Sequence, residues 1–296
     1  MQHRERLRAW QKSGKWHKYK GYSIFCQMAG AGEPLVLIHG FPTASWDWKG
    51  VWADLASKYQ VITFDMIGFG FSDKPTDYVY SIVDQANLVE SILQETGIRQ
   101  CHLLCHDYGD SVGQELLARQ REGNAKLRIE TTCFLNGGLF PEVHQPALIQ
   151  KLLLSPAGAF VSRLVTRRMF DLNMQRILGS LTQPTDRQLE EFWQLLEYNN
   201  GRAVMHRLIK YMEERRCLRQ RWVEPMLDSG LPMAFINGVE DPISGANMVA
   251  RYKTLIAKPY VVELAGVGHY PHVELPGEVV AGYLQFRERF SVVVSH

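Results

Sequence analysis

The sequence lacks any run approaching the roughly eighteen apolar residues that an α-helix needs to cross a bilayer. It also lacks an apolar stretch near the N-terminus that would indicate a secretion signal. Cysteine is scarce, and the five cysteines form no CxxC pair, which argues against a disulfide framework or a zinc site. These absences predict a soluble protein of the reducing cytoplasm.

An excess of one charge is missing too, since 33 Lys and Arg residues face 31 Asp and Glu residues, for a formal net charge of +2. Proteins that bind nucleic acid usually concentrate a large basic excess on one face, so we expect no nucleic-acid partner. The exception is the segment 1–20, where seven basic residues surround Trp10 and Trp16. We interpret it as a solvated arm, and weak contact with an anionic membrane surface stays open. The oligomeric state cannot be predicted.

What is present is a chain of 296 residues, 46% hydrophobic, long enough for a large core. Apolar runs rich in β-formers alternate with helical patterns, which predicts an α/β fold with a mostly parallel central sheet flanked by helices. The alternation breaks once, where the sequence becomes helical and rich in arginine. We predict a core of residues 1–138 and 226–296 with an inserted helical cap, or lid, of residues 139–225. The expected strands are 35–38, 60–64, 101–105, 129–135, 232–236 and 260–264, and the expected helices are 82–95, 110–121, 246–256 and 278–290.

One predicted strand, 101–105, ends abruptly in the sequence HDYG at residues 106–109, and a helical pattern follows. A tight turn from strand to helix needs small residues two before and two after its apex, because the backbone approaches itself there. Cys105 and Gly109 supply them around Asp107. The pattern predicts that Asp107 stands at the apex as a nucleophile rather than as a residue that caps the helix.

The same stretch contains a Gly-x-Ser-x-Gly pattern at residues 109–113, which is typical of a serine esterase with Ser111 at the apex. That alternative requires a buried strand to continue through Asp107 and Gly109, where the centre of a sheet favours apolar side chains. We therefore prefer Asp107, and an esterase that uses Ser111 remains an alternative.

A carboxylate nucleophile forms an ester that water must hydrolyse, so the site needs a histidine to activate water and an acid to orient that histidine. Asp241 directly follows one predicted strand, and His269 follows the next. Open α/β sheets place their sites at these strand ends. We predict a triad of Asp107, Asp241 and His269, with Glu240 and His272 as the neighbouring alternatives to the acid and the base.

The sequence HGFP at residues 39–42 follows another apolar run and resembles the loop that supplies one amide of an oxyanion hole. Phe41 would donate that amide, and Tyr108, the residue after the nucleophile, would donate the other. The hole would stabilise the charge that develops on oxygen when water attacks the ester of Asp107.

Together these motifs resemble the epoxide hydrolase and haloalkane dehalogenase branch of the α/β-hydrolase superfamily. The motifs that carry the resemblance are HGFP at 39–42, DMIGFGFSDKP at 65–75, HDYG at 106–109, Asp241 and His269, and the match extends from about residue 15 to the C-terminus. Within the branch the sequence looks closest to the mesoderm-specific transcript proteins, through GFPTASWDW, GFGFSDKP, HDYGDSVGQELL, NGGLFPE and RQRWV. The pattern of those proteins carries an aliphatic residue where this sequence has Ser111. The resemblance implies an α/β-hydrolase fold.

Epoxide hydrolases hold the epoxide oxygen with two tyrosines of the cap, and the resemblance implies that Tyr211, thirty residues before Asp241, is the second of them. The first has no clear counterpart, since no tyrosine occurs between Tyr108 and Tyr198. Either Tyr198 substitutes from another part of the cap or a single donor suffices. Dehalogenases hold the halide with an indole beside the nucleophile and an Asn or Trp partner, and Tyr108 and Phe41 occupy those positions here. Dehalogenation is therefore the second choice.

The resulting hypothesis is a hydrolase in which Asp107 attacks a small apolar epoxide while Tyr211 supports the leaving oxygen. His269, oriented by Asp241, then activates water, and neither a metal ion nor an organic cofactor is needed. The side chains expected to line the substrate pocket are His39, Trp46, His106 and Tyr198. The alternatives are haloalkane dehalogenation, β-lactone opening by the same aspartate, ester hydrolysis through Ser111, and a ligand-binding or interaction protein with little activity.

Overall fold

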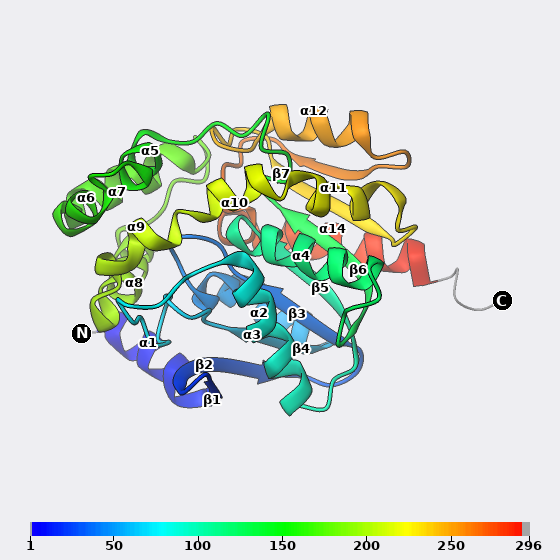
Figure 1. Cartoon of the computed structure of the whole chain (residues 1–296), viewed down its shortest axis with the longest axis horizontal. Coiled ribbons are helices and arrows are strands. Elements are labelled where there is room, and N and C mark those ends of the chain that lie inside the picture. Colours follow the sequence, from blue (N-terminus) through cyan, green and yellow to red (C-terminus); the bar gives the residue numbers. More distant parts are fainter. Residues whose placement is uncertain (1, 292–296) are drawn as a thin grey trace.

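The computed structural model describes residues 2–291 and contains one sheet of eight strands in the order β1-β2-β4-β3-β5-β6-β7-β8 (Figure 1). The strands β1 and β2 are antiparallel, β2 pairs antiparallel with β4, and the pairs from β4 to β8 are parallel. All six strands expected from the sequence are confirmed. The strand bounds are β1 Lys15–Tyr19, β2 Tyr22–Ala29, β3 Pro34–Ile38, β4 Gln60–Phe64, β5 Gln100–His106, β6 Arg128–Leu135, β7 Met233–Gly238 and β8 Tyr260–Leu264.

Helices cover both faces of the sheet, because alternate residues of each strand point to opposite faces and both sets are apolar. In β3, Leu35 and Leu37 join a core cluster with residues of α2 and α14, whereas Val36 and Ile38 join the cluster that contains α3 and α4. The bounds of the core helices are α2 Trp52–Ala56, α3 Ile82–Glu95, α4 Tyr108–Arg121, α12 Ala246–Leu255, α13 Pro271–Glu274 and α14 Pro276–Ser291, with a 3-10 helix η1 at Ser45–Gly50. The four expected helices are therefore present, with ends shifted by at most two residues.

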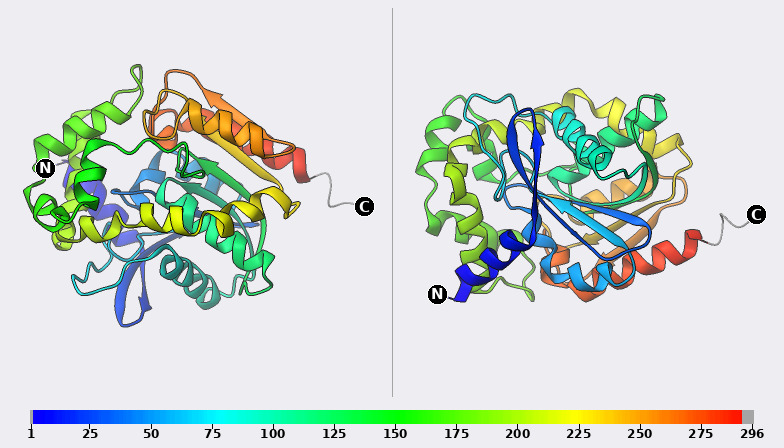
Figure 2. Two further views of the ribbon diagram at one scale, coloured as in Figure 1. Left: turned by 45° about the horizontal axis from the view of Figure 1, so that its top comes forward. Right: turned by 90° about the horizontal axis from the view of Figure 1, so that it is seen from below.

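The alternation of strand and helix stops between β6 and β7, where the chain forms only helices. The helices of residues 148–208 lie together at one end of the molecule, at the left in Figure 1 and in both views of Figure 2, whereas those of residues 211–228 extend over the core. Their bounds are α5 Leu148–Leu154, α6 Gly158–Leu164, α7 Arg167–Ile177, α8 Asp186–Glu197, η2 Tyr198–Val204, α9 Met205–Leu208, α10 Tyr211–Cys217 and α11 Arg219–Asp228. The last of them, α11, packs along α4 of the core, where the Trp222 indole donates to Glu115 at 2.8 Å. The exact division into core and cap stays a prediction. Within residues 2–291 no helix is long and apolar enough to cross a bilayer.

The N-terminal segment is not the solvated arm that its charge predicted. Residues 2–13 form helix α1 (Gln2–Ser13), and Trp10 is 5% exposed. Its ring makes edge contacts with Trp46 and Trp52 at centroid distances of 5.6 and 5.1 Å. The burial of this indole outweighs the exposure of the basic residues around it. The strand that follows was also missed, although Lys20 and Gly21, both with positive φ, mark the tight turn of a hairpin.

Candidate active site

Asp107 stands at the junction of β5 and α4 with φ 48° and ψ −103°, a strained conformation for a residue with a side chain. The turn is tight: a Cβ at Gly109 would come 2.2 Å from the carbonyl oxygen of Ile38, so only glycine fits there. Asp107 makes no side-chain capping hydrogen bond to α4, so its carboxylate does not serve as a helix cap. The predicted turn is present, with the aspartate at its apex.

The carboxylate of Asp107 is buried and held by the HGFP loop. Its Oδ2 accepts a hydrogen bond from the Phe41 amide at 3.1 Å, the donor expected for the oxyanion hole. Burial alone would raise the pKa of Asp107, but the charges of His269 and Arg215 outweigh burial and lower the pKa. The carboxyl group is therefore ionised at neutral pH. Tyr108 is the first residue of α4, so its amide lies at the positive end of that helix.

Asp241 and His269 come together as expected, from the loops after β7 and β8. The Nδ1 of His269 lies 2.7 Å from Oδ2 of Asp241. Asp241 also accepts hydrogen bonds from Asn136 Nδ2 at 3.0 Å and from Ser244 Oγ at 2.6 Å. Burial opposes the charged carboxylate, but the charge of His269 and these hydrogen bonds lower the pKa of Asp241 to about 2. Asp241 thus stays ionised and fixes the tautomer of His269, leaving Nε2 free to act as a base.

The rivals considered for the acid and the base have other partners. Glu240 is exposed at its loop and accepts hydrogen bonds from the amide and hydroxyl of Ser180. His272 is buried with its ring 4.3 Å from that of Trp48. Asn136 is a residue that the sequence analysis missed. The available signal was its position directly after the strand β6, in the same sheet edge as the triad.

Tyr211 begins helix α10 and is buried beside Asp107, with its ring 4.9 Å from Tyr108 and 6.2 Å from Phe41. Its hydroxyl makes no hydrogen bond of normal geometry with any residue of the described part of the chain. Burial and the negative charge of Asp107 raise the pKa of Tyr211. The hydroxyl therefore keeps its proton and is available to donate it.

Arg215, one turn after Tyr211, is the functional residue that sequence reasoning missed. Its guanidinium is 2% exposed and lies 4.5 Å above the Tyr211 ring. The Nη2 atom donates to the backbone oxygen of Asp107 at 2.5 Å and lies 3.5 Å from the Asp107 carboxylate. The Nε atom donates to Ser111 Oγ at 2.6 Å. The Nη1 atom is buried and has no hydrogen-bond partner among residues 2–291.

Ser111, the apex of the alternative motif, lies inside α4 and is fully buried. Its hydroxyl accepts from Arg215, and a histidine is not among its hydrogen-bond partners in the described residues. The neighbouring Asp110 is also buried, and neither carboxylate oxygen makes a hydrogen bond of normal geometry with a described residue. Burial outweighs the charge of Arg215 and raises the pKa of Asp110 well above its usual range. A Cβ at Gly137 would lie 2.2 Å from Asp110, which shows how tightly this acid is enclosed.

The four side chains expected to line the pocket have their own partners. His39 Nε2 accepts from the Met66 amide at 3.0 Å, which fastens the HGFP loop from behind. The Trp46 indole donates to Glu191 of α8 at 3.1 Å.

The remaining two side chains, His106 and Tyr198, have their partners in the loop of His269 and in α1. His106 Nε2 lies 2.8 Å from the backbone oxygen of His269 and positions that loop. The Tyr198 hydroxyl accepts from Gln11 of α1 at 3.3 Å. The structure brings Phe41, Asp107, Tyr211, Asp241 and His269 together, but it occupies the Tyr198 hydroxyl elsewhere.

One group of described side chains could hold a metal ion. Asp47, His106 and His272 are all buried, and one ligand atom of each lies within 4.8 Å of the others. Because His106 Nε2 must donate to a carbonyl oxygen, its Nδ1 is a bare acceptor. Asp47 offers a second acceptor in Oδ1, and His272 has both ring nitrogens unpaired within the described chain. A single internal water, which donates twice and accepts once, satisfies this arrangement as well as a cation does.

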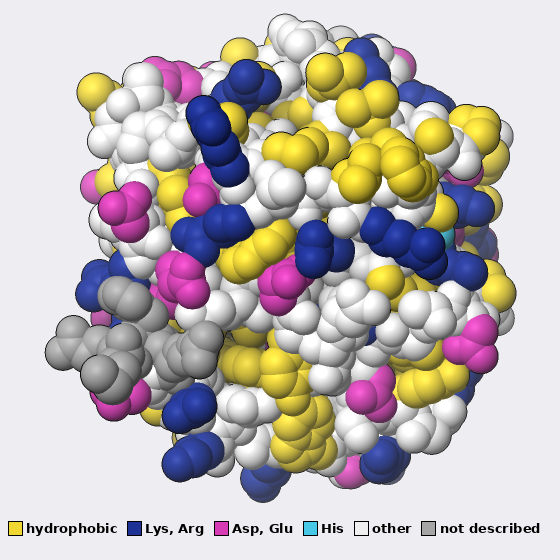
Figure 3. Space-filling model, turned by 90° about the vertical axis from the view of Figure 1, so that its left-hand side faces the viewer, with side chains coloured by type: hydrophobic (Ala, Val, Ile, Leu, Met, Phe, Trp, Pro, Cys, Tyr) yellow, Lys and Arg dark blue, Asp and Glu magenta, His cyan; other side chains and the backbone are white. Residues whose placement is uncertain are grey.

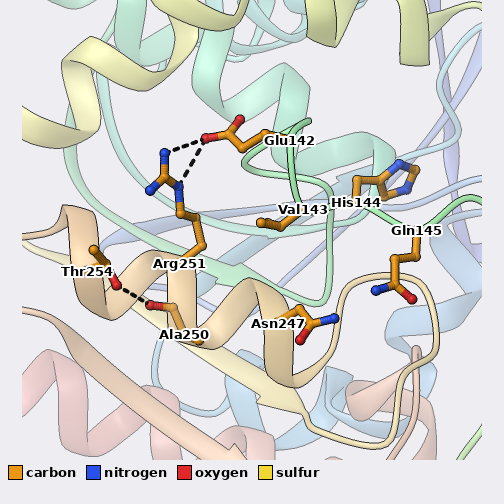
Figure 4. A pocket seen from close by; sticks show the side chains of 8 residues that line it. All are labelled: Glu142, Val143, His144, Gln145, Asn247, Ala250, Arg251 and Thr254. Carbon is orange, nitrogen blue, oxygen red and sulfur yellow. Dashed lines mark hydrogen bonds and ion pairs between the residues drawn. The ribbon is translucent and has the colours of Figure 1, made fainter.

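A surface hollow of about 420 Å³ is lined by the segment that follows β6 and by α12 (Figure 4). Glu142 and Arg251 form an ion pair across it at 2.9 Å. His144 lines this hollow and also the neighbouring one. A Cβ at Gly138 would lie 2.3 Å from Arg215 Nη1 and 3.2 Å from His144 Cδ2, so both side chains lie close to this glycine. His144 therefore lines the hollow and lies near Arg215.

The chain is similar to known proteins in sequence and in fold. The chain is 39% identical to the mesoderm-specific transcript protein of Mus musculus over 96% of this chain and 88% of that protein. It is 35% identical to the putative hydrolase LipZ of Mycobacterium tuberculosis over 91% of this chain and 94% of that protein.

Among solved structures, the epoxide hydrolase CorEH without ligand superposes with a TM-score of 0.73 at 18% identity, covering 93% of this chain and 98% of that one. This last similarity concerns the fold alone. Residues 35–282 match the model of the alpha/beta hydrolase family. The fold expected from the motifs is thereby confirmed, and the chain belongs to the α/β-hydrolase family.

Proposed function

We propose that this hydrolase uses Asp107 as its nucleophile, passes through an alkyl-ester intermediate and opens a small apolar epoxide to a diol. The observation that carries the proposal is the geometry of Asp107. It occupies the strained apex with its carboxylate on the Phe41 amide, whereas Ser111 is buried within α4. A nucleophile must be presented at such an apex to reach the substrate.

In the first half-reaction, an oxygen of the Asp107 carboxylate attacks a ring carbon, and the carbon–oxygen bond of the epoxide breaks. Tyr211 transfers its proton to the leaving oxygen, which becomes the first hydroxyl of the product. The site supplies a second donor in Arg215, whose Nη1 is unpaired. Arg215 takes the place of the first cap tyrosine, for which Tyr198 is no substitute because its hydroxyl is bonded to α1.

Arg215 also supports the reaction through charge. When Asp107 becomes an ester it loses its negative charge, and a guanidinium that is 2% exposed loses its counter-ion. An uncompensated buried charge costs several kcal/mol, on the order of 3–5 kcal/mol. The negative charge on the leaving oxygen, or on Tyr211 after it gives up its proton, restores the balance. Arg215 therefore favours the transition state over the free substrate.

In the second half-reaction, His269 removes a proton from water, and the resulting hydroxide attacks the ester carbonyl of Asp107. The Phe41 amide and the N-terminal end of α4 stabilise the charge on the carbonyl oxygen. The bond between the Asp107 carbonyl carbon and the alkyl oxygen breaks, and the proton held by His269 passes to that oxygen to give the second hydroxyl of the diol. The proton of the Asp107 acid so formed returns to the Tyr211 phenolate, which restores both the carboxylate and the tyrosine. Asp241 holds the histidine throughout.

Arg215 favours one second candidate, the opening of a β-lactone by the same aspartate. Attack at the ring carbon that bears the alkyl oxygen breaks that carbon–oxygen bond and releases a carboxylate. A carboxylate needs no proton and matches a guanidinium with a free Nη1. Haloalkane dehalogenation lacks its indole donors here, since Tyr108 and Phe41 hold those positions.

Isotope labelling tests the proposal. After a single turnover of excess enzyme in oxygen-18 water, mass spectrometry of the Asp107 peptide should show one heavy oxygen in its carboxylate. Absence of the label, with product formed, would rule out the ester. Inactivity on epoxides, β-lactones, haloalkanes and esters, combined with a ligand-dependent shift in melting temperature, would instead favour a binding protein.

A further inference from the structure

Exposed hydrophobic side chains are concentrated on one part of this molecule. Seven of the twelve large hydrophobic residues that are exposed among the described residues lie between positions 148 and 181. Phe160 is 67% exposed, Leu148 70% and Leu181 85%. Isolated apolar residues are normal on a protein surface, but a cluster of this size marks an interaction site.

The same segment repeats one arrangement in three successive helices. Each helix exposes two apolar residues one turn apart, with an exposed basic residue next to one of them. The sets are Leu148, Leu152 and Lys151 in α5, Phe160, Leu164 and Arg163 in α6, and Met169, Leu172 and Arg168 in α7. We call these nine residues the basic apolar face. Figures 1 and 2 place the three helices together at one end of the molecule, and Figure 3, which looks onto that end, shows hydrophobic patches with Lys and Arg between them.

The charge of this segment differs from that of the rest of the chain. Residues 148–181 contain five basic residues and one acidic residue, a net charge of +4, whereas the whole chain has +2 and the remainder therefore −2. Within the described chain, Lys151, Arg163 and Arg168 take part in no ion pair. Arg167 is the member of the segment that is paired, with Asp171 and Glu190. Three exposed cations are thus free to bind an external anion.

We infer that the basic apolar face docks on the surface of a bilayer that contains anionic phospholipids. Apolar side chains at an interface enter the boundary between headgroups and acyl chains, while Lys and Arg beside them bind the phosphates. A second copy of the chain fits less well, because a two-fold contact would oppose the same cations. This inference concerns a surface and stands whether or not the proposed epoxide reaction is correct.

Helix α7 connects the basic apolar face to the candidate active site. The carbonyl oxygen of Ile177, the last residue of that helix, accepts a hydrogen bond from the amide of His269 at 2.8 Å. Two residues later, the amide of Gly179 donates to Glu274 in α13. One side of α7 therefore lies on the bilayer, while the C-terminal end of the same helix holds the loop that carries His269. This location suits an enzyme whose apolar substrate dissolves in the membrane.

Vesicle sedimentation of the full chain tests the inference. We expect the protein to sediment with vesicles of equal parts phosphatidylcholine and phosphatidylglycerol, and to stay in solution with phosphatidylcholine alone. The triple variant Lys151→Gln, Arg163→Gln, Arg168→Gln should bind about a hundredfold more weakly, at about fivefold for each basic residue. The double variant Leu148→Ser, Phe160→Ser should also lose binding. A higher salt concentration should weaken the binding of the wild type to anionic vesicles.

Matched controls place the same changes on other surfaces. Val79→Ser with Leu227→Ser removes exposed apolar side chains elsewhere, and Lys58→Gln, Arg99→Gln, Lys126→Gln removes three exposed cations. Both controls should bind vesicles like the wild type, and the melting temperature of every variant should show that it is folded. The inference is wrong if the wild type does not bind anionic vesicles, or if the test variants and the control variants bind these vesicles equally well. A dimer in analytical ultracentrifugation that Phe160→Ser abolishes would show self-association instead.

Discussion

The Nη2 atom of Arg215 donates a hydrogen bond to the backbone oxygen of Asp107 at 2.5 Å, whereas it lies 3.5 Å from the carboxylate of the same residue. The contact to the backbone fixes the arginine, while the longer contact leaves part of its hydrogen-bonding capacity for another anion. Nη1, which has no partner in the described chain, points to the same conclusion. The arginine is thus positioned before any substrate arrives.

Replacing Arg215 should therefore slow ester formation more than ester hydrolysis. We expect Arg215→Met to lower the single-turnover rate of Asp107 alkylation about a hundredfold or more, the typical effect of losing one preorganised charge donor. Arg215→Lys keeps the charge but loses the fork and should recover part of the rate. Rapid-quench kinetics on an epoxide separate the two steps. Equal loss in both steps would show that Arg215 merely supports the fold.

The nucleophile can be identified by comparing two variants four residues apart. Asp107→Asn should abolish turnover, by at least about 10⁴-fold, because no ester can form. Ser111→Ala removes only a hydrogen bond to Arg215 and should cost less than about tenfold. Steady-state assays on epoxide, β-lactone and ester substrates measure both. The opposite result on an ester would favour the serine mechanism.

Tyr211→Phe should lower the activity without lowering the stability of the fold. The buried hydroxyl lacks a hydrogen bond of normal geometry, so its removal should leave stability unchanged or raise it by about 1 kcal/mol. Loss of the proton donor should lower the rate of epoxide opening about a hundredfold. A carboxylate leaving group needs no proton, so β-lactone opening should be affected much less. Thermal melting and kcat on matched substrates provide the measurements.

The rate of ester hydrolysis should fall on the acid side. Burial opposes the charged imidazolium, but Asp241 and Asp107 outweigh it and raise the pKa of His269 above 6.5. Below that pKa the imidazole is protonated and cannot accept a proton from water. Esterification removes the charge of Asp107, so the pKa of His269 should fall within the intermediate and restore the base. Asp241→Asn should shift the acid limb of kcat to lower pH, which a pH–rate profile would show.

Stability should respond to pH in two windows. The raised pKa of His269 means that its stabilising contribution is present below pH 6.5 and is lost as the pH rises through the folded value. The pKa of Asp241 is lowered from 3.8 to about 2, so its contribution is present above pH 3.8 and is lost as the pH falls through about 2. Urea unfolding across pH, compared between the wild type and Asp241→Asn, measures both. A pH dependence that the variant leaves unchanged would contradict this assignment.

His144 should control access to Arg215 from the surface hollow. It lines the hollow and lies near Arg215, and burial together with the charge of Arg215 lowers the pKa of His144 to about 3. We expect His144→Ala to raise kcat/KM for bulky epoxides several-fold relative to small ones, because a larger opening reduces steric exclusion. His144→Gln serves as the control of similar size. An unchanged size preference would show that substrates enter elsewhere.

The parts of the fold that could be predicted are those with strong local patterns. The buried parallel strands and the turn around Asp107 follow from apolar runs and from the spacing of small residues, and both were found where expected. Strand β1 and helix α1 were missed because basic residues mask their buried positions, although Trp10 supplies the buried contact. Strand β2, which pairs with β1, was missed although it contains no basic residue. Charge at the surface says little about what an amphipathic segment buries.

The candidate site was predictable in its strand ends but not in its cap. Asp107, Asp241 and His269 follow strands, so the sheet alone brings them together. Arg215 could not be placed, since one arginine among many in a helical segment has no distinguishing sequence pattern. Tyr198 shows the reverse case, because a residue type that suited the chemistry turned out to bond α1. Tertiary packing decides which polar side chain of a helix faces inward.

The N-terminal helix has a consequence for the order in which the chain can mature. Arg6 pairs with Glu191, a residue 185 positions later, and Gln11 donates to Tyr198. During synthesis, α1 leaves the ribosome before α8, and it must wait for α8 before these contacts can form. Contacts so distant in sequence are costly to close and form late. We therefore expect α1 to dock in a late folding step, with its buried indole exposed to chaperones until then.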